Sequence, residues 1–266
     1  MTGGTRTGPL IAAAILVAVA PTVRAGGGAA EISQDCAVRT GCFPGDAAGF
    51  PVTIDGSSGL SYRLTTDLVL PDAGTTAIDV TSPDVHLDLG GFKILTSACL
   101  GATASCRPSP DQGVGVRATP LGLHLRNGDI VGMGLAGVLA GGQARLEGLR
   151  VSQSAQAGIT LGGASVVRNT ASFSNGGAGI VTGSASIVAA SSIVSNLGNG
   201  VSAGDGSMVI ECTVRNNGNV GLIFPSPASG YSENTITNNG GQAVSGGTNL
   251  GNNLCVGPGV GSAACP

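Results

Sequence analysis

The sequence predicts an all-β protein, a single-stranded parallel β-helix with three short strands per coil of about 21 residues and about eight or nine coils. Three observations lead to this prediction. A small residue followed by an aliphatic one recurs at a nearly fixed interval, short runs of alternating polarity separate Gly- and Asn-rich turns, and the apolar residues of successive units share one register. A fixed period of this size indicates stacked units that bury one continuous core.

The recurring pair gives the period directly. Successive pairs are 22, 21, 21, 21 and 21 residues apart, and a seventh follows after 22 more. The pairs are Gly115-Val116, Gly137-Val138, Gly158-Ile159, Gly179-Ile180, Gly200-Val201, Gly221-Leu222 and Ala243-Val244.

One unit, residues 158–178, shows how a coil is built. Ile159 and Leu161 alternate around Thr160, residues 166–168 form a second short run, and residues 170–173 form a third. Runs of three to five residues bounded by Gly and Asn are typical of strands rather than helices. Three strands that repeat without reversal predict coils stacked about 4.8 Å apart.

Stacking the units predicts which residues point inward. The predicted inward rows are Val116, Val138, Ile159, Ile180, Val201 and Leu222; then Leu87, Leu125, Leu146, Val167, Val188 and Val209; then Ile130, Val151, Ser172, Ile193, Val214 and Ile236. A turn row contains Asn175, Asn196, Asn217 and Asn239. Stacked asparagines can hydrogen-bond along such a row and tolerate the left-handed conformation that a turn needs.

Residues 1–25 have the features of a secretory signal peptide. Arg6 precedes an apolar run from Leu10 to Ala20, which is too short to span a bilayer comfortably, and small residues follow at Val23 and Ala25. Cleavage after residue 25, 29 or 30 fits the pattern, and an uncleaved anchor is the alternative. The prediction is therefore a secreted or periplasmic protein that keeps no stable membrane anchor after signal cleavage.

The remaining segments flank the coils. Residues 26–75 do not repeat and are predicted to form an N-terminal cap and a first irregular coil, residues 76–244 the repeats, and residues 245–266 a C-terminal cap. Both ends of a solenoid expose a strand edge that must be covered. An insertion over residues 96–113 is predicted to project from one coil as a loop, where binding functions often lie.

The seven cysteines lie beyond the signal peptide, and six of them form close sequence pairs. Export permits disulfides, so we predict Cys36–Cys42, Cys99–Cys106 and Cys255–Cys265. Cys212 occupies a small inward position of the repeat and is predicted to be a buried free thiol. No Cys-x-x-Cys motif occurs, which disfavours a zinc site, and we predict no metal and no cofactor.

Removing Arg6 and Arg24 with the signal leaves 10 of the 12 basic residues against 15 acidic ones, so we predict no nucleic-acid partner.

Several segments resemble proteins of the pectin-lyase-like superfamily. The turn sequences at residues 174–180 and 195–201 are similar to the repeats of that superfamily, and residues 85–92 resemble its V-x-L-D-L-N-G-F segment, with Gly90 where Asn is common. The resemblance covers roughly residues 50–254 and implies a right-handed parallel β-helix. It implies no single activity, because the superfamily includes pectate lyases, polygalacturonases, alginate epimerases and many exported proteins of other roles.

The outward-facing residues of the predicted strands give little support to the activities of that superfamily. The outward row of the first strand, Asp79, Arg117, Leu139, Thr160, Val181, Ser202 and Ile223, lacks the clustered oxygens that calcium needs. No aspartate cluster of the kind used in glycoside hydrolysis occurs, and no Asp-Pro-His-Glu motif of the epimerase type is present.

The strongest polar constellation lies on the second strand. His86 and His124 fall at equivalent positions of adjacent coils beside Asp88 and Arg126, which makes these four the candidate catalytic residues, with a His/Asp acid–base pair. The alternative is a structural ladder of alternating charge that favours one register. Candidate binding residues on the same and the next strand are Arg145, Glu147, Arg150 and Arg168, with Asp129 beside Arg150.

Further along, the same face turns apolar. An outward aliphatic patch indicates a covering segment or a partner surface, and we expect the C-terminal cap to fold back over it. Its residues are Val166, Ile187, Met208, Ala189 and Ile210.

We therefore predict an exported protein that binds polysaccharide or cell-surface glycan without a recognisable catalytic site. One alternative is a polysaccharide lyase, hydrolase or epimerase acting on acidic glycan, and another is a structural or adhesive surface protein. The sequence leads to no prediction of oligomeric state.

Overall fold

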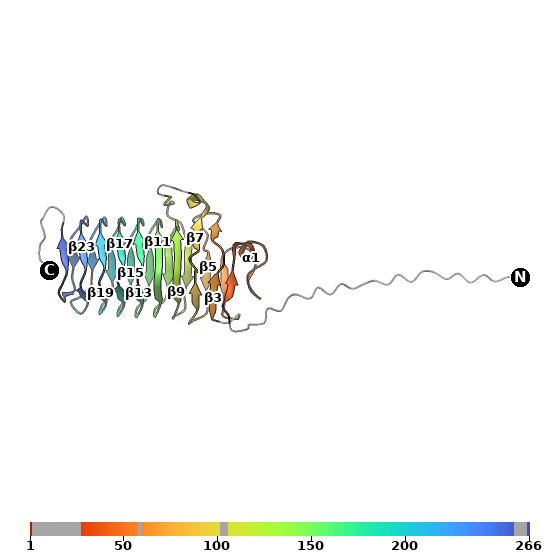
Figure 1. Cartoon of the computed structure of the whole chain (residues 1–266), viewed down its shortest axis with the longest axis horizontal. Coiled ribbons are helices and arrows are strands. Elements are labelled where there is room, and N and C mark those ends of the chain that lie inside the picture. Colours follow the sequence, from red (N-terminus) through yellow and green to blue (C-terminus); the bar gives the residue numbers. More distant parts are fainter. Residues whose placement is uncertain (2–27, 58–59, 102–105, 258–264) are drawn as a thin grey trace.

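The computed structural model describes residues 1, 28–57, 60–101, 106–257 and 265–266. In this part of the chain, nine coils stack along one axis and form the body of the β-helix, which we call the barrel. Figure 1 shows the coils as a row of strands between the two ends of this barrel. Each strand pairs in parallel with the equivalent strand of the neighbouring coil. The predicted all-β parallel β-helix, with three strands per coil, is confirmed.

The first face of the barrel is a nine-stranded sheet, and we number the coils 1–9 by its strands. These are β2 (Val52–Ile54), β5 (Ile78–Val80), β8 (Val114–Ala118), β10 (Ala136–Ala140), β12 (Ile159–Leu161), β15 (Ile180–Thr182), β18 (Val201–Ala203), β21 (Leu222–Ile223) and β24 (Val244–Ser245).

The second face begins one strand earlier. It contains β1 (Ala30–Ile32), β3 (Ser61–Leu64), β6 (His86–Asp88), the first halves of β9 (His124–Val131) and β11 (Arg145–Ser152), β13 (Val166–Arg168), β16 (Ile187–Ala189), β19 (Met208–Ile210), β22 (Gly230–Ser232) and β25 (Thr248–Asn249).

The third face joins the second through the long strands β9 and β11, so that together they form a sheet of 17 strands. It contains β4 (Leu68–Leu70), β7 (Lys93–Thr96), the second halves of β9 and β11, β14 (Ala171–Phe173), β17 (Ser192–Val194), β20 (Thr213–Arg215), β23 (Thr235–Thr237) and β26 (Leu254–Val256).

The predicted inward rows pair in the expected register. Val138 lies opposite Val116 and Ile159 on the first face, and Leu146 lies opposite Leu125 and Val167 on the second. All of these side chains belong to one buried core. Ser172 interrupts the third row, and its hydroxyl donates a hydrogen bond to the carbonyl oxygen of Gly179 at 2.7 Å.

The recurring glycine has a steric cause. It lies at the start of the first-face strand, at the corner where that strand approaches the third face. A Cβ atom on Gly179 would lie 2.4 Å from Cγ2 of Ile193 and 2.9 Å from the carbonyl oxygen of Gly200. Real Cβ atoms do not approach other atoms so closely, and overpacking of this kind is destabilising. Gly137, Gly158 and Gly200 have equally short distances.

The predicted asparagine row forms a buried ladder at the corner after the third face. The side-chain amide of Asn196 donates to Oδ1 of Asn217 at 2.9 Å and to the carbonyl oxygen of Ser172 at 3.0 Å. Its own Oδ1 accepts from the side chain of Asn175 at 2.9 Å and from the backbone N–H of Asn175 at 3.1 Å.

The left-handed conformation falls elsewhere than expected. It is adopted by the residue before each ladder asparagine, which is Ser174, Ser195, Asn216 or Asn238. The ladder asparagines therefore satisfy buried backbone groups, while exposed or half-buried polar residues make the sharp bend. A second ladder, of serine hydroxyls, runs through Ser165, Ser186, Ser207 and Ser229 at another corner.

The two ends are closed differently. At the N-terminal end, the short helix α1 (Gln34–Arg39) follows β1, and Ala37 inserts into the core. Figure 1 shows α1 at that end of the barrel. At the C-terminal end, the hydroxyl of Tyr231 donates to the carbonyl oxygen of Pro266. The predicted signal peptide lies almost entirely in residues 2–27, outside the described residues.

The three predicted disulfides, Cys36–Cys42, Cys99–Cys106 and Cys255–Cys265, are all present. Disulfides of this kind persist in oxidising compartments. Cys212 is a buried free thiol, as predicted, and burial raises its pKa to about 12. It therefore stays protonated and unreactive at neutral pH.

The segment between β7 and β8 contains the 3₁₀ turn η1 (Ser97–Cys99) and returns along the barrel. The backbone N–H of Cys106 donates to Oε1 of Gln153 at 2.7 Å, and that of Asp111 donates to the carbonyl oxygen of Gly134 at 3.0 Å. Figure 1 shows η1, in yellow, on the outside of the stack of strands. Within the described residues, neither helical segment has the length and apolar character of a membrane-spanning helix.

We predict that Asn196→Ala destabilises the protein by about 2–4 kcal/mol, because it leaves several buried hydrogen-bonding groups unsatisfied. Urea unfolding measures the free energy of unfolding. The matched control is Asn219→Ala, since Asn219 is exposed at the surface, and it should change stability by less than about 0.5 kcal/mol. Equal effects of the two substitutions would show that the ladder contributes no net stability.

Candidate functional site

The candidate residues lie on the second face, in two columns that flank its inward row. Each three-residue strand segment there presents one outward side chain before the inward residue and one after it. The column before it, which we call the basic column, contains Ser61, His86, His124 and Arg145. The column after it, which we call the charge ladder, contains Glu31, Arg63, Asp88, Arg126, Glu147 and Arg168.

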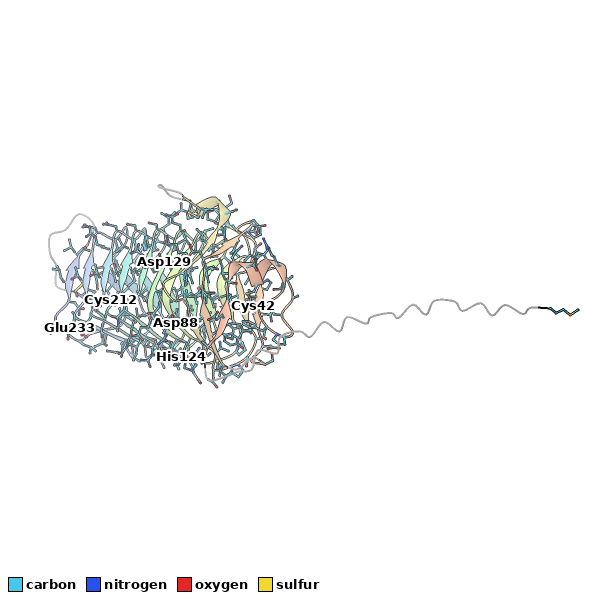
Figure 2. The ribbon with its side chains drawn as sticks, turned by 45° about the vertical axis from the view of Figure 1, so that its right-hand side comes forward. Cys42, Asp88, His124, Asp129, Cys212 and Glu233 are labelled. Carbon is cyan, nitrogen blue, oxygen red and sulfur yellow. A yellow bond between two sulfur atoms is a disulfide. The ribbon has the colours of Figure 1, made fainter. Side chains whose placement is uncertain are left out.

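A groove of about 630 Å³ lies over these columns in coils 1–4. Figure 2 labels Asp88 and His124 together in this part of the barrel. Six candidate residues line the groove: His86, Asp88, His124, Arg126, Arg145 and Glu147. The other two do not, because Arg168 lies one coil further on, in β13, and Arg150 belongs to the third face.

The charge ladder alternates in sign over six strands. Arg126 binds Asp88 through two nitrogens, with Nη2 at 2.8 Å and Nε at 2.9 Å from Oδ2 of the carboxylate. Arg63 pairs with Glu31 at the N-terminal end. A shift of the stack by one coil would bring like charges together, which is unfavourable. The alternation therefore supports the register, as the structural alternative predicts.

Asp88 is occupied by structural contacts. Besides Arg126, its Oδ1 accepts a hydrogen bond from the backbone N–H of Gly90 at 2.8 Å and lies 3.3 Å from the side-chain amide of Asn127. Among the described residues, neither histidine hydrogen-bonds to this carboxylate. A catalytic base normally needs a partner that orients it, so the expected His/Asp pair stays a prediction without this support.

The two histidines lie against each other. Their ring centroids are 4.4 Å apart and the rings are tilted by 46°. Burial lowers the pKa of His124, the positive charges of His86 and Arg145 lower it further, and Asp84 acts in the opposite direction. His124 is therefore neutral at pH 7 and gains its positive charge only when the pH falls.

Arg145 and Glu147 complete the groove. Both side chains are exposed, and among the described residues neither forms an ion pair. Arg145 is thus a cation without a protein partner at the edge of a concave surface, and Glu147 is an acceptor suited to hydroxyl groups. This combination can bind a ligand that carries both anionic groups and hydroxyls.

The remaining candidate binding residues form a separate cluster on the third face. Nε of Arg150 lies 3.8 Å from Oδ1 of Asp129, and its guanidinium lies over the ring of Phe173, 5.2 Å from the ring centroid. On the first face, Arg117 binds both carboxylate oxygens of Asp79, at 3.0 and 2.8 Å. Both arrangements link neighbouring coils rather than shape a cavity.

Coil 1 forms one end of the groove, which the sequence did not predict. Ala29, Ser61, Tyr62 and Arg63 line it together with the candidate residues. The pattern Ser-Tyr-Arg at residues 61–63 matches His-Leu-Asp at residues 86–88, but the spacing of 25 residues departs from the regular period. Within the described residues, no group of three or more His, Cys, Asp or Glu side chains is arranged to hold a metal ion.

Comparison with protein-family models and with curated protein sequences gives no match. Among solved structures, the chain is similar to pectate lyase Pel9A, with a TM-score of 0.48 and 12% identity over 86% of this chain and 68% of that one. It is also similar to the periplasmic alginate epimerase AlgG, with a TM-score of 0.45 and 10% identity over 79% of this chain.

The matched region spans 58% of the length of that epimerase. A variant of the same epimerase, D317A, matches with a TM-score of 0.37 and 12% identity over 85% of this chain and 82% of that one. At these identities the similarity concerns the course of the backbone. The fold of the chain is established by the strand pairing described above.

We predict that His124 titrates below its ordinary pKa of about 6.5. A titration followed by NMR of the imidazole nitrogens measures this pKa directly. His86→Gln should raise it, because this substitution removes a neighbouring positive charge while the burial of His124 remains. A pKa of His124 at or above 6.5 in the unaltered protein would contradict the geometry of the pair.

Proposed function

We propose that the protein is an exported glycan-binding protein whose groove on coils 1–4 holds an acidic polysaccharide. One observation carries the proposal: the groove contains Arg145, which forms no ion pair among the described residues, beside the adjacent imidazole rings of His86 and His124. The three disulfides are consistent with an oxidising, exported location.

The dimensions of the groove suit an extended chain. The basic column repeats at the coil spacing of about 4.8 Å, which is close to the length of one monosaccharide unit. Successive sugars can therefore meet equivalent protein positions in successive coils. Arg145 can bind a carboxylate or sulfate group, and Glu147 can accept hydrogen bonds from sugar hydroxyls.

Binding without turnover fits the state of the carboxylates better than catalysis does. Asp88 is held by Arg126, Asn127 and the backbone of Gly90, so it is not free to act as an acid or base. Catalysis by His124 remains the alternative, because a neutral imidazole can act as a general base. Assembly of a structural or adhesive surface protein is the third hypothesis.

The first experiment is a glycan array probed with the purified protein, followed by calorimetry with the glycans that bind. Alginate and pectate belong in the panel, because the names of the structural neighbours mention them. Turnover is followed on the same panel by chain cleavage and by the absorbance of new double bonds. Turnover that His124→Ala lowers at least about a hundredfold would establish the enzyme hypothesis instead.

We predict that Arg145→Ala weakens binding of an acidic glycan about tenfold, a loss of roughly 1.4 kcal/mol. The matched control is Arg215→Ala, since Arg215 is an exposed arginine on the third face outside the groove. The control should bind like the unaltered protein. An equal loss in both variants would show that binding follows overall charge, and the groove would not be the binding site.

We also predict that acidic glycan binds more tightly as the pH falls from 8 to 5.5. A bound anion favours the protonated form of His124, so it raises the pKa of His124 relative to that in the free protein. The gain in affinity is complete below the lowered pKa that His124 has in the free protein. It disappears as the pH rises through the pKa that His124 has in the complex. The double variant His86→Gln/His124→Gln should lose this pH dependence, and a dependence that persists in it would assign the effect to other groups.

A further inference from the structure

The second face continues beyond the groove as an apolar patch. In coils 5–7 the basic column becomes Val166, Ile187 and Met208. The charge ladder becomes Ala189 and Ile210 in coils 6 and 7. The patch and the groove therefore lie end to end along one face.

Leu250 follows β25 in coil 9, and its side chain extends the patch back over coil 8. Its side chain is 56% exposed, and a Cβ atom placed on Gly230 would lie only 2.8 Å from its Cδ1 atom and 3.0 Å from Sδ of Met208. The absence of a side chain at Gly230 thus lets Leu250 and Met208 lie side by side.

The expected covering segment is not found in the described part of the chain. Val166, Ile187, Met208 and Ile210 are all partly exposed. The C-terminal residues that the structure describes contact other positions, since Cys265 accepts a hydrogen bond from Asn249 and Pro266 accepts one from Tyr231. An uncovered apolar surface of this extent indicates a partner.

The charged residues beside the patch restrict the kinds of partner that can bind it. Glu211 and Glu233 follow β19 and β22 at the same corner of adjacent coils, and both are exposed. Stacked like charges repel each other, and among the described residues neither carboxylate has an ion-pair partner. Arg168 of coil 5 lies at the other end of the patch, and it is likewise exposed and without an ion pair within the described residues.

We propose that this patch is the interface of a two-fold symmetric dimer. A second copy covers the apolar patch and brings Arg168 near Glu233 when the two-fold axis lies in the plane of the face, perpendicular to the barrel axis, between coils 6 and 7. This rotation keeps each corner on its own side and reverses the order of the coils. Coil 5 of one copy then lies opposite coil 8 of its partner, and coil 6 lies opposite coil 7.

In this arrangement the surface is complementary to itself. Arg168 lies opposite Ser232 of the second copy, beside its Glu233. Val166 lies opposite Gly230, over which the side chain of Leu250 lies, and Ile187 lies opposite Met208. A symmetric interface makes every such contact twice. Figure 2 shows Glu233 near the C-terminal end of the barrel, away from Asp88 and His124 of the groove.

A membrane surface fits less well, because the carboxylates of Glu211 and Glu233 would face anionic headgroups. The dimer is also a weak one. The patch covers four coils, or about 15–20 Å along the barrel, so the buried area falls at the low end of specific interfaces, where weak and transient complexes are found.

Sedimentation of the disulfide-bonded chain over a range of concentrations tests the dimer. The unaltered protein should convert from monomer to dimer as its concentration rises. Ile187→Lys should leave it monomeric at every concentration. Val181→Lys, on β15 of the same coil but on the first face, is the matched control and should dimerise like the unaltered protein.

A charge exchange tests the proposed pairing itself. Arg168→Glu and Glu233→Arg should each weaken the dimer at least about tenfold, and the double variant should restore it, because the pair is only reversed. A monomer at all concentrations, or a double variant no better than the single ones, overturns the proposal. Cosedimentation of the monomer with vesicles of neutral and anionic phospholipid would assign the patch to a membrane instead.

This proposal is independent of glycan binding. The groove occupies coils 1–4 and the interface is centred on coils 5–8, with coil 9 of the second copy opposite coil 4 at the edge of the groove. The monomeric variant Ile187→Lys should therefore bind the glycans of the array at least as well as the unaltered protein does.

Discussion

The register between neighbouring coils is the constraint on which the rest of the structure depends. Each coil hydrogen-bonds only to the coils before and after it, so one residue more or less would turn every inward side chain outward. Two devices hold the register at the corners. The glycines at the entry to the first face allow a contact that no Cβ atom permits, and the asparagine ladder binds the backbone of the adjacent coil through buried amides. Both repeat every 21 or 22 residues because a coil has that length.

Register also explains why charged residues gather on one end of one face. A charge can be accommodated on the outside of the barrel when the next coil offers the opposite sign, as Asp88 and Arg126 do. The basic column departs from this rule, because His86, His124 and Arg145 follow one another without an acid between them. Such a column costs stability through repulsion, which the lowered pKa of His124 relieves by keeping that ring neutral. The departure from pairing, rather than the presence of charge, distinguishes the groove from the structural ladders.

The regular part of the fold could be predicted from the sequence because its information is local and repeated. The rows through Val138, Leu146 and Val151 follow from the period alone, and so do the pairing of the histidines and the buried state of Cys212. The departures arise where the period fails or where contacts depend on backbone detail. Coil 1 has an irregular spacing, so its contribution to the groove through Tyr62 and Arg63 was missed. The engagement of Asp88 by the backbone of Gly90 and the left-handed residues before the ladder asparagines depend on turn geometry that the register does not specify.

The two proposed surfaces have a joint consequence through symmetry. A two-fold axis perpendicular to the barrel reverses the direction of the second copy, so the grooves of the proposed dimer would lie at opposite ends of the assembly and run in opposite directions. One glycan chain could not follow both grooves in the same sense along its length. Two chains of opposite direction, or a chain that turns back, could occupy them together, and binding at each groove would then be reinforced by the linkage between the two. The dimer would in that case cross-link glycan chains, a behaviour that neither surface produces alone.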